Sequence, residues 1–395
     1  MTSEPSSPEP NAAISGERDT PKRVVFWGTY DLGKPRTRIL RDSLGEVGVE
    51  VIEVHADIWA KHEDKSQAGF RAILWTLLRG LIAYPRLIYG YLKAPAHDAV
   101  VVPYLGQFDV LILKPFVWAR RRPVVWDMFI SLYDTVVCDR RMLRPWNPVA
   151  LALRALEWLS CRTVDLVLLD TKTHALRISD LFSLPQERVD AVPVGAEPAA
   201  FRRLARRVPG DGKTRILFYG QLIPLHGIET ILDAALSEEG RAHEWHIIGS
   251  GQDGKLVEKK LHGQNAVHIQ WEKWRPYEAL IDAIEDADIC LGIFGSSDKA
   301  GSVVPNKVYQ CLMAGRTVIT RKSEAISQTF PEPHAGLLLV DHADPHALIA
   351  GIEDAKNQGL PTMQKQDIAI ARPADIGVRL KAILGNVCRE SSRYG

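Results

Sequence analysis

The chain has 395 residues, which is too long for one ordinary hydrophobic core and suits two domains of moderate size. Charged residues make up 25% of the chain and apolar residues 46%, a balance typical of globular proteins. The net charge of +1 gives no global field that would attract nucleic acid, so no nucleic-acid partner is expected.

Residues 1–21 are rich in Ser, Pro, Glu and Ala and lack an apolar core, which predicts a disordered tail rather than a signal peptide. The five cysteines are scattered without a CxxC pair, which indicates reduced thiols and a cytoplasmic protein. No cluster of side chains has the spacing of metal ligands, so no metal site is expected. No uninterrupted apolar run is long enough to span a bilayer.

Apolar, β-branched runs alternate with helical patterns, which predicts an α/β fold with parallel sheets. Residues 22–201 are expected to form a doubly wound N-terminal domain. Its predicted strands are Val24–Trp27, Val49–Val54, Ala99–Val102, Pro123–Trp126 and Leu166–Leu169. Ligands of such sheets bind at the carboxyl ends of the strands.

The loop after the first strand reads "GTYDLGKPRTR". Gly28 and Gly33 bracket this loop, and Pro35 is placed to begin a helix. Arg36 and Arg38 would lie in the first helical turn, where positive charge opposes the helix dipole but is useful beside an anion. Gly33 and Arg36 are therefore candidates for the acceptor or sugar side of a site. An ordinary polar loop is the alternative.

Residues 69–94 are strongly apolar, rich in Trp and Tyr, and carry only positive charges. With about 100° per residue in a helix, four basic residues fall within an arc of about 80°, namely Arg71, Arg79, Arg86 and Lys93. A basic stripe beside apolar residues is typical of a helix that lies on an anionic membrane, and Pro85 should kink or divide this helix. The alternative is a buried helical pair with one solvated edge.

Three carboxylates of the first half are expected near strand ends. Asp127 follows a predicted strand directly, so its carboxylate should point into the cleft, and we take it as the candidate catalytic residue. Asp134 follows on an irregular or helical stretch, and Asp170 ends another strand. Such carboxylates can bind sugar hydroxyls or take a proton from an acceptor alcohol. For each of them, a helix cap or a satisfied loop residue is the alternative.

Residues 202–214, "RRLARRVPGDGKT", are basic and then Gly-rich, which predicts a linker. Residues 215–371 are expected to form a second doubly wound domain facing the first across a cleft. Residues 372–395 are expected to form a helix that crosses back to the N-terminal domain. The predicted strands of the second half are Arg215–Tyr219, Trp245–Ile248, Val267–Gln270, Ile289–Ile293 and Thr317–Thr320.

Three strand-to-helix turns of the second half are suited to anions. The first, "YGQLIPLHGIET", offers Gln221 and His226 beside Gly220. A basic side chain usually helps to neutralise an anion held on such a turn, and only His226 could do so here.

The second turn, "IIGSGQDG", places Gly249, Gly251 and Gly254 at G-x-G-x-x-G spacing, and Glu272 follows the next predicted strand. This is the dinucleotide-binding fingerprint, which on its own is a weak signal, and a nicotinamide enzyme is a minor alternative. It lies after the second strand of its domain, however, whereas that fingerprint belongs to the first βα turn.

The third turn reads "GIFGSSDKAGSVVPNKVYQCLMAGRTVIT". We expect a loop over Phe294–Gly301 and a helix that has Pro305 as an early residue and stops at Gly315. The polar candidates in this turn are Lys299, Ser302, Asn306, Lys307 and Gln310.

The motifs "FYGQLIPLHGIETILDAA", "WHIIGSGQ", "DADICLGIF" and "VPNKVYQCLMAGRTVIT", in this order, resemble the donor-binding half of retaining glycosyltransferase family 4. The resemblance covers nearly all of residues 22–390 and is more specific in the C-terminal half. It implies a GT-B fold of two Rossmann-like domains. It also implies metal-independent transfer from a nucleotide diphosphate sugar, with no cofactor.

The chain departs from this family at four positions. The family's Arg and Lys that grip the donor diphosphate fall on Gln221 and His226, and its two glutamates fall on Gln310 and near Ser302. Lys299 and Lys307 could supply part of the lost positive charge. The candidate donor site therefore consists of Gly220, Gln221, His226, Gly249, Gly251, Glu272, Gly295, Lys299, Ser302, Pro305, Asn306, Lys307 and Gln310.

The sequence thus predicts a glycosyltransferase that uses a nucleotide diphosphate sugar and a glycan or lipid-linked acceptor, in cell-surface glycan or glycolipid synthesis. A peripheral position on the inner face of the plasma membrane follows from residues 69–94. The alternative is a catalytically degenerate GT-B protein that binds a nucleotide sugar or a partner as scaffold or sensor.

Overall fold

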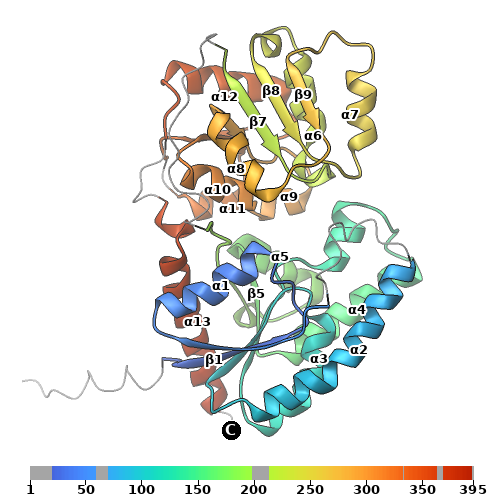
Figure 1. Ribbon diagram of the computed structural model, residues 1–395, viewed down its shortest axis with the longest axis vertical. Helices are drawn as coiled ribbons and strands as arrows, with labels where there is room; N and C mark the ends of the chain where they lie inside the picture. The colour runs from blue at the N-terminus through green and yellow to red at the C-terminus, as the bar shows by residue number, and fades with distance from the viewer. Residues whose placement is uncertain (1–19, 59–69, 198–212, 332, 363–367, 394–395) are drawn as a thin grey trace, which may run out of the picture.

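The computed structural model describes residues 20–58, 70–197, 213–331, 333–362 and 368–393. Two domains are stacked along the long axis of the molecule, each built on a parallel sheet of six strands (Figure 1). The two sheets confirm the predicted α/β class with two doubly wound domains. The predicted tail up to residue 19 and the predicted linker up to residue 212 lie outside the described residues.

The N-terminal sheet has the strand order β2-β1-β3-β4-β5-β6. Its strands are apolar runs that are mostly buried on both faces, as expected for a parallel sheet covered by helices. They are β1 (Arg23–Gly28), β2 (Glu50–His55), β3 (Ala99–Val102), β4 (Val124–Asp127), β5 (Leu166–Leu169) and β6 (Val189–Ala191).

Helices cover both faces of this sheet. One face carries α2 (Phe70–Lys93), α3 (Gln107–Ala119), α4 (Pro148–Thr163) and α5 (Lys172–Phe182), and a π-helical turn, η2 (Asp134–Asp139), follows β4. The other face carries α1 (Pro35–Glu46) and the last helix, α13 (Pro373–Arg393). Because α13 packs against α1, the chain returns from the second domain to the first (Figure 1).

The C-terminal sheet has the strand order β12-β11-β10-β7-β8-β9. Its strands are β7 (Arg215–Tyr219), β8 (Glu244–Ile248), β9 (Ile269–Glu272), β10 (Ile289–Leu291), β11 (Thr317–Arg321) and β12 (Leu337–Val340). One face packs against α6 (Ile228–Leu236), α7 (Gly254–Leu261) and α12 (Pro345–Asn357). The opposite face packs against α8 (Tyr277–Asp286), α10 (Asn306–Met313) and α11 (Glu324–Thr329).

Several predicted boundaries were wrong. The prediction missed β6 and β12, which are edge strands of three and four residues, too short to show a pattern of their own. The loop predicted in the third turn, Phe294–Gly301, contains the start of a short helix, α9 (Asp298–Ser302), whose N-terminus is capped by Ser297. Pro305 is the N-cap of α10 rather than a residue inside it.

The helix expected in residues 69–94 is present as α2, and Pro85 lies inside it without dividing it. The structure describes no side chains for residues 70–78, so the position of Arg71 on the stripe lies outside the described residues. Among the residues that the structure describes, no helix is both long and apolar enough to cross a membrane.

Candidate functional site

The carboxyl ends of β7 and β8 meet at two glycines, and this contact shapes the first candidate turn. Gly220 follows β7 with φ +142°, and Gly249 follows β8 with φ +157°. A Cβ atom on Gly249 would lie 1.9 Å from the carbonyl oxygen of Gly220, so any larger residue would push the two turns apart. Gly251 lies in the same way against the backbone of Leu222. The predicted glycines therefore form one compact surface at the sheet edge.

Lys307 and His226 converge above Gly220. A Cβ atom built on Gly220 would lie 3.0 Å from Nζ of Lys307 and 3.1 Å from Cε1 of His226. Lys307 comes from the first turn of α10, and His226 from the short 3₁₀ turn η4 (Pro224–His226). Two segments far apart in the sequence, the turn of residues 220–226 and the start of α10, thus bring a lysine and a histidine to one glycine.

Lys307 is a buried cation without a hydrogen-bond partner in the part of the chain that the structure describes. Its side chain is only 6% exposed, and Nζ lies 3.9 Å from the ring centroid of Phe218. Burial lowers the pKa of Lys307 to about 7. A cation held in this state gains strongly from any anion that reaches it, so Lys307 has the character of an anion ligand.

The environment of His226 disfavours its charged form when no ligand is bound. Burial, followed by the nearby charge of Lys307, holds the pKa of His226 well below its usual range. Its Nδ1 atom donates a hydrogen bond to the carbonyl of Gln221, which leaves Nε2 as the ring nitrogen that could meet a ligand. The imidazole is therefore neutral at neutral pH until an anion arrives.

The N-terminal domain adds an arginine to this turn. Nη2 of Arg140 donates to Oε1 of Gln221 at 3.0 Å, and Nε2 of Gln252 donates to the carbonyl of Arg140 at 3.1 Å. Nε of Arg140 is buried and has no hydrogen-bond partner among the described residues. Arg140 was not among the predicted site residues, because nothing in the sequence signals a contact between residues 81 positions apart.

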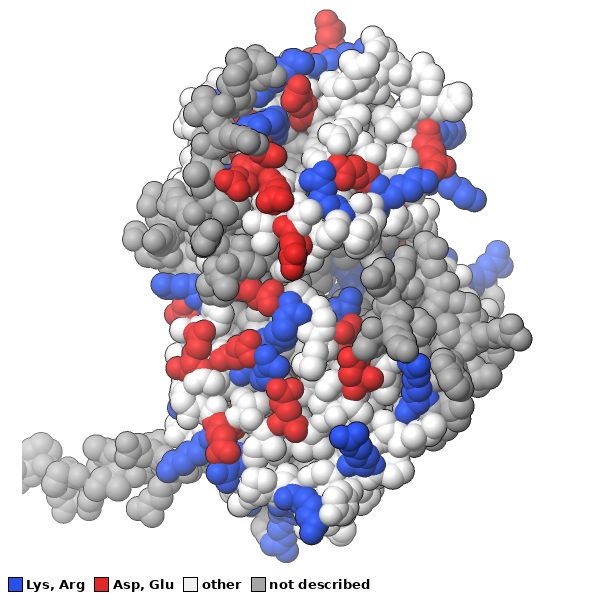
Figure 2. Space-filling model, in the orientation of Figure 1, with Lys and Arg blue, Asp and Glu red and all other residues white. Residues whose placement is uncertain are grey.

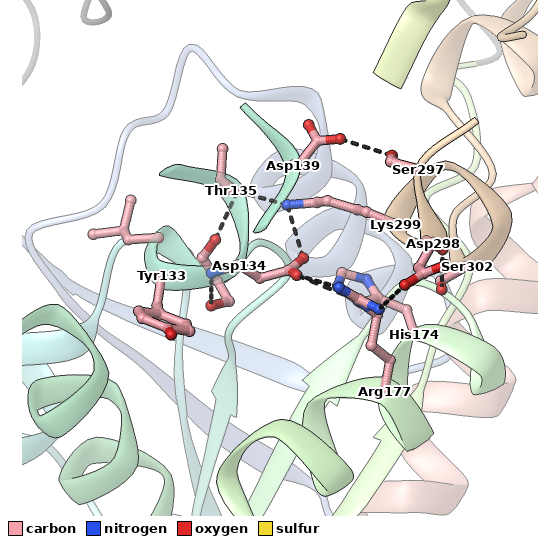
Figure 3. Close-up of polar contacts among 12 residues, drawn as sticks. Tyr133, Asp134, Thr135, Asp139, His174, Arg177, Ser297, Asp298, Lys299 and Ser302 are labelled. Atoms are coloured by element: carbon pink, nitrogen blue, oxygen red, sulfur yellow. Dashed lines mark hydrogen bonds and ion pairs between the residues drawn. The ribbon is translucent and has the colours of Figure 1, made fainter. Parts of the chain in front are cut away.

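Lys299 does not lie with Lys307 but reaches across to the N-terminal domain (Figure 3). Its Nζ lies 3.2 Å from Oδ2 of Asp134 and donates to Oγ1 of Thr135 at 2.6 Å. Arg177 of α5 donates to the other carboxylate oxygen of Asp134 at 2.8 Å. Lys299 and Asp134, predicted as donor and acceptor residues, are thus partners of each other in this conformation.

The electrostatics of Asp134 follow from these two cations. Burial alone would raise the pKa of Asp134, but Lys299 and Arg177 outweigh that effect and hold it below its usual range. A second contact between the domains joins Oγ of Ser297 to Oδ1 of Asp139 at 2.8 Å (Figure 3). Polar contacts between turn η2 and α9 therefore join the two domains.

The remaining candidates of the third turn lie close to α10. Ser302 ends α9; its hydroxyl donates to the carbonyl of Asp298 at 2.8 Å, and its own carbonyl accepts from Thr171 of the N-terminal domain. Asn306 opens α10, with Pro305 as the N-cap. The N–H group of Gly295 donates to the carbonyl of Leu225, which ties the third turn to the first.

Gln310 is buried between two tyrosines. Its Oε1 accepts from the hydroxyl of Tyr219 at 2.9 Å, and its Nε2 donates to the hydroxyl of Tyr277 at 3.4 Å. The Tyr277 hydroxyl donates in turn to Glu197 of the N-terminal domain at 3.1 Å. The expected contact of Gln310 with a ribose would require it to give up one of these partners.

The expectation that Asp127 points into an open cleft is wrong. Asp127 is the last residue of β4 and is fully buried, where Arg36 donates to its carboxylate at 2.6 and 2.9 Å. Nη1 and Nη2 of Arg36 also donate to the carbonyls of Val192 and Leu169. Arg36, predicted to lie beside a bound anion, is thus bonded to Asp127 and to two backbone carbonyls.

Three other predicted residues have partners of their own. Asp170 accepts from Nδ1 of His174 at 2.6 Å, and Nε2 of this buried histidine has no hydrogen-bond partner among the described residues. Gly33 lies in an exposed loop where its N–H group donates to Asp31. Glu272 ends the edge strand β9 and pairs with His246 and Arg275, outside the cluster around Gly220.

The described residues contain no group of three or more His, Cys, Asp or Glu side chains that could hold a metal ion.

The chain is similar to known glycosyltransferases in part of its sequence and in its fold. Residues 213–357 match the family model "Glycosyl transferases group 1". No curated protein matches the chain. Among solved structures, the chain is similar to sucrose-phosphate synthase from Thermosynechococcus elongatus, at 14% identity and a TM-score of 0.62, covering 94% of this chain and 98% of that one.

Two further solved structures have nucleotides bound. The catalytic domain of starch synthase IV from Arabidopsis thaliana, bound to ADP and acarbose, aligns at 9% identity and a TM-score of 0.63, covering 93% of this chain and 99% of that one. HepE from Anabaena, in complex with UDP and glucose, aligns at 12% identity and a TM-score of 0.59, covering 91% and 98%. These similarities confirm the GT-B fold over almost the whole chain.

Proposed function

We propose that the protein is a glycosyltransferase that moves a sugar from a nucleotide diphosphate donor to an acceptor hydroxyl with retention of configuration. The observation that carries this proposal is the buried Nζ of Lys307, which has no hydrogen-bond partner among the described residues and lies with His226 above Gly220. The GT-B fold and the match of residues 213–357 to group 1 glycosyl transferases support it. No metal or cofactor is part of the proposal.

In this proposal the leaving diphosphate lies over Gly220. Lys307 and His226 neutralise its charge from the C-terminal domain, and Arg140 does so from the N-terminal domain. The bond between the sugar C1 atom and the diphosphate breaks, and a bond from C1 to the acceptor oxygen forms on the same face. The acceptor proton passes to the departing phosphate oxygen, so the protein mainly orients the reactants and stabilises the leaving group.

The other predicted residues take supporting parts. Asn306 lies at the N-terminus of α10, where backbone N–H groups favour an anion, and Gln310 would turn toward the ribose. Lys299 would bind the diphosphate only after releasing Asp134. Asp127, paired with Arg36, positions the ends of β4 and α1 rather than touching the substrate.

A glycan or lipid-linked acceptor is proposed on the side of the N-terminal domain, with the protein peripheral on the inner face of the plasma membrane. Figure 2 shows a row of Lys and Arg side chains along the part of α2 whose side chains are described, with no Asp or Glu between them. This row supports contact with anionic lipid, because polybasic segments gain about 1 kcal/mol per residue near such a surface.

The test of this function is the release of nucleoside diphosphate from nucleotide sugars, with and without candidate acceptors. We expect wild-type protein to release diphosphate from at least one donor by slow hydrolysis, and faster when an acceptor is present. The anomeric configuration of the product, read by NMR, tests retention. Binding of a nucleotide sugar without any release or transfer would favour the degenerate GT-B protein, which the changed residues Gln221 and Gln310 also fit.

A further inference from the structure

The outer side of residues 140–162, which we call the α4 surface, has an unusual charge distribution. From residue 103 to residue 164 the sequence contains nine basic residues, none of which is buried. The same stretch contains five acidic residues, and each is at most 4% exposed: Asp109, Asp127, Asp134, Asp139 and Glu157. Glu157, the acidic residue of α4, bonds inward to Gln107 and Ser131. Residues 140–162 themselves therefore present basic side chains to solvent and no acidic ones.

Large apolar side chains accompany these arginines. Trp146 is 69% exposed and Trp158 is 45% exposed, and Met142, Leu151 and Leu159 are also exposed. The guanidinium of Arg162 lies 4.0 Å from the ring centroid of Trp158, and that of Arg144 lies 5.7 Å from that of Trp146. A tryptophan with an arginine over its ring combines an apolar body with a charged group, which suits the headgroup level of a bilayer.

The α4 surface begins at the candidate site. Arg140 contacts Gln221 of the donor turn, and Trp146 follows it by six residues, a span of at most roughly 20 Å. Because α3 packs between α2 and α4 on the same face of the sheet, the α4 surface also continues from the basic row of α2.

We propose that the α4 surface docks on an anionic phospholipid bilayer, and that the acceptor is therefore a hydroxyl carried by a membrane lipid. The second part rests on the proposed function. A second copy of the chain fits less well, because a two-fold contact would place arginines against arginines. A nucleic acid fits less well, because exposed Leu151, Leu159 and Met142 offer it no partner, whereas they suit acyl chains.

The experiment is co-sedimentation of the full chain with vesicles of phosphatidylcholine alone and of phosphatidylcholine with phosphatidylglycerol. Wild-type protein should bind the anionic vesicles and be released by salt. Each basic contact contributes about 1 kcal/mol, so the double substitution Arg144→Glu/Arg154→Glu should weaken binding by at least roughly 30-fold. Trp146→Ala/Trp158→Ala should also weaken binding to the same vesicles. Because the contribution of the tryptophans is apolar, this loss should not depend on the salt concentration.

Matched controls lie on the C-terminal domain. Lys255→Glu/Lys259→Glu reverses two exposed charges of α7, and Trp274→Ala removes a tryptophan that is 67% exposed. Both should bind vesicles like wild type. Arg79→Glu/Arg86→Glu separates the contribution of α2.

Wild-type binding by the Arg144/Arg154 variant, or equal binding of wild type to neutral and anionic vesicles, would overturn the proposal. So would a concentration-dependent dimer that the Arg144/Arg154 substitutions abolish. Stabilisation by nucleoside diphosphates in solution should be the same in all these variants. If nucleoside diphosphates do not stabilise the wild-type protein, this result would count against the proposed function and not against membrane docking.

Discussion

Replacing Lys307 by alanine is expected to weaken binding of a nucleoside diphosphate by roughly 10- to 150-fold. The reason is that Nζ of Lys307 is desolvated and has no competing hydrogen bond within the described part of the chain, and a bond to a charged partner contributes about 1.5–3 kcal/mol. Isothermal titration calorimetry on wild type and Lys307→Ala measures this change directly. An affinity of Lys307→Ala equal to that of wild type would show that Lys307 does not bind the diphosphate.

The same lysine predicts how affinity depends on pH. The pKa of free Lys307 is about 7, and a bound diphosphate raises it. Below pH 7 the lysine is charged in both states, so its contribution is fully present. Above pH 7 binding must take up a proton, and the contribution is lost as pH rises through the raised pKa of the complex, by up to tenfold per pH unit.

Arginine at this position is the matched control, because its charge does not titrate in this range. The affinity of Lys307→Arg relative to that of wild type should therefore rise between pH 7 and pH 9. His226→Gln tests the second titrating group, whose ligand-free pKa lies well below its usual range. The ionisation of the diphosphate itself is common to all variants and cancels in the comparison. Parallel pH profiles for wild type and Lys307→Arg would contradict the assignment.

Replacing Arg36 by alanine is expected to lower the free energy of unfolding by about 3–5 kcal/mol. The substitution leaves the carboxylate of Asp127 buried without its ion partner, and an uncompensated buried charge has this cost. For a domain of this size, a melting temperature lower by roughly 6–20 °C follows. Differential scanning calorimetry measures it.

The double variant Arg36→Met/Asp127→Leu separates a structural pair from a catalytic one. Because both charges are removed together, it should regain most of the stability that Arg36→Ala loses. A melting temperature of Arg36→Ala equal to that of wild type would contradict the structural role of the pair. Loss of turnover in Asp127→Asn with full stability and donor affinity would show that Asp127 acts on the substrate.

The sheets of this protein could be predicted because their central strands are clear apolar runs in the sequence. The apolar runs Ala99–Val102 and Leu166–Leu169 are flanked by polar turns, and both became strands with the predicted bounds. The edge strand Ile269–Glu272 was displaced by two residues, since half-exposed strands carry a weaker pattern. Edge strands β6 and β12 were missed for the same reason.

The candidate site was predictable in part. Gly220, His226 and Lys307 were expected at the ends of two strands of one sheet, and parallel strands bring such residues together. Contacts between the domains could not be predicted in this way. Arg140 beside Gln221 and Asp134 beside Lys299 depend on how the two sheets face each other, which no local pattern specifies. Asp127 was misjudged because Arg36, 91 residues earlier, covers it.

The central claim is that the turn at Gly220 holds the diphosphate of a nucleotide, and a thermal-shift panel tests it most directly. The panel pairs each nucleoside diphosphate with its monophosphate and measures the melting temperature of the wild-type chain. At a hundred times its Kd a ligand adds roughly 2.7 kcal/mol, or roughly 5–10 °C for a domain of this size. We predict such a shift for at least one diphosphate and a clearly smaller one for its monophosphate. No shift with any diphosphate, or equal shifts with diphosphate and monophosphate, would contradict the claim.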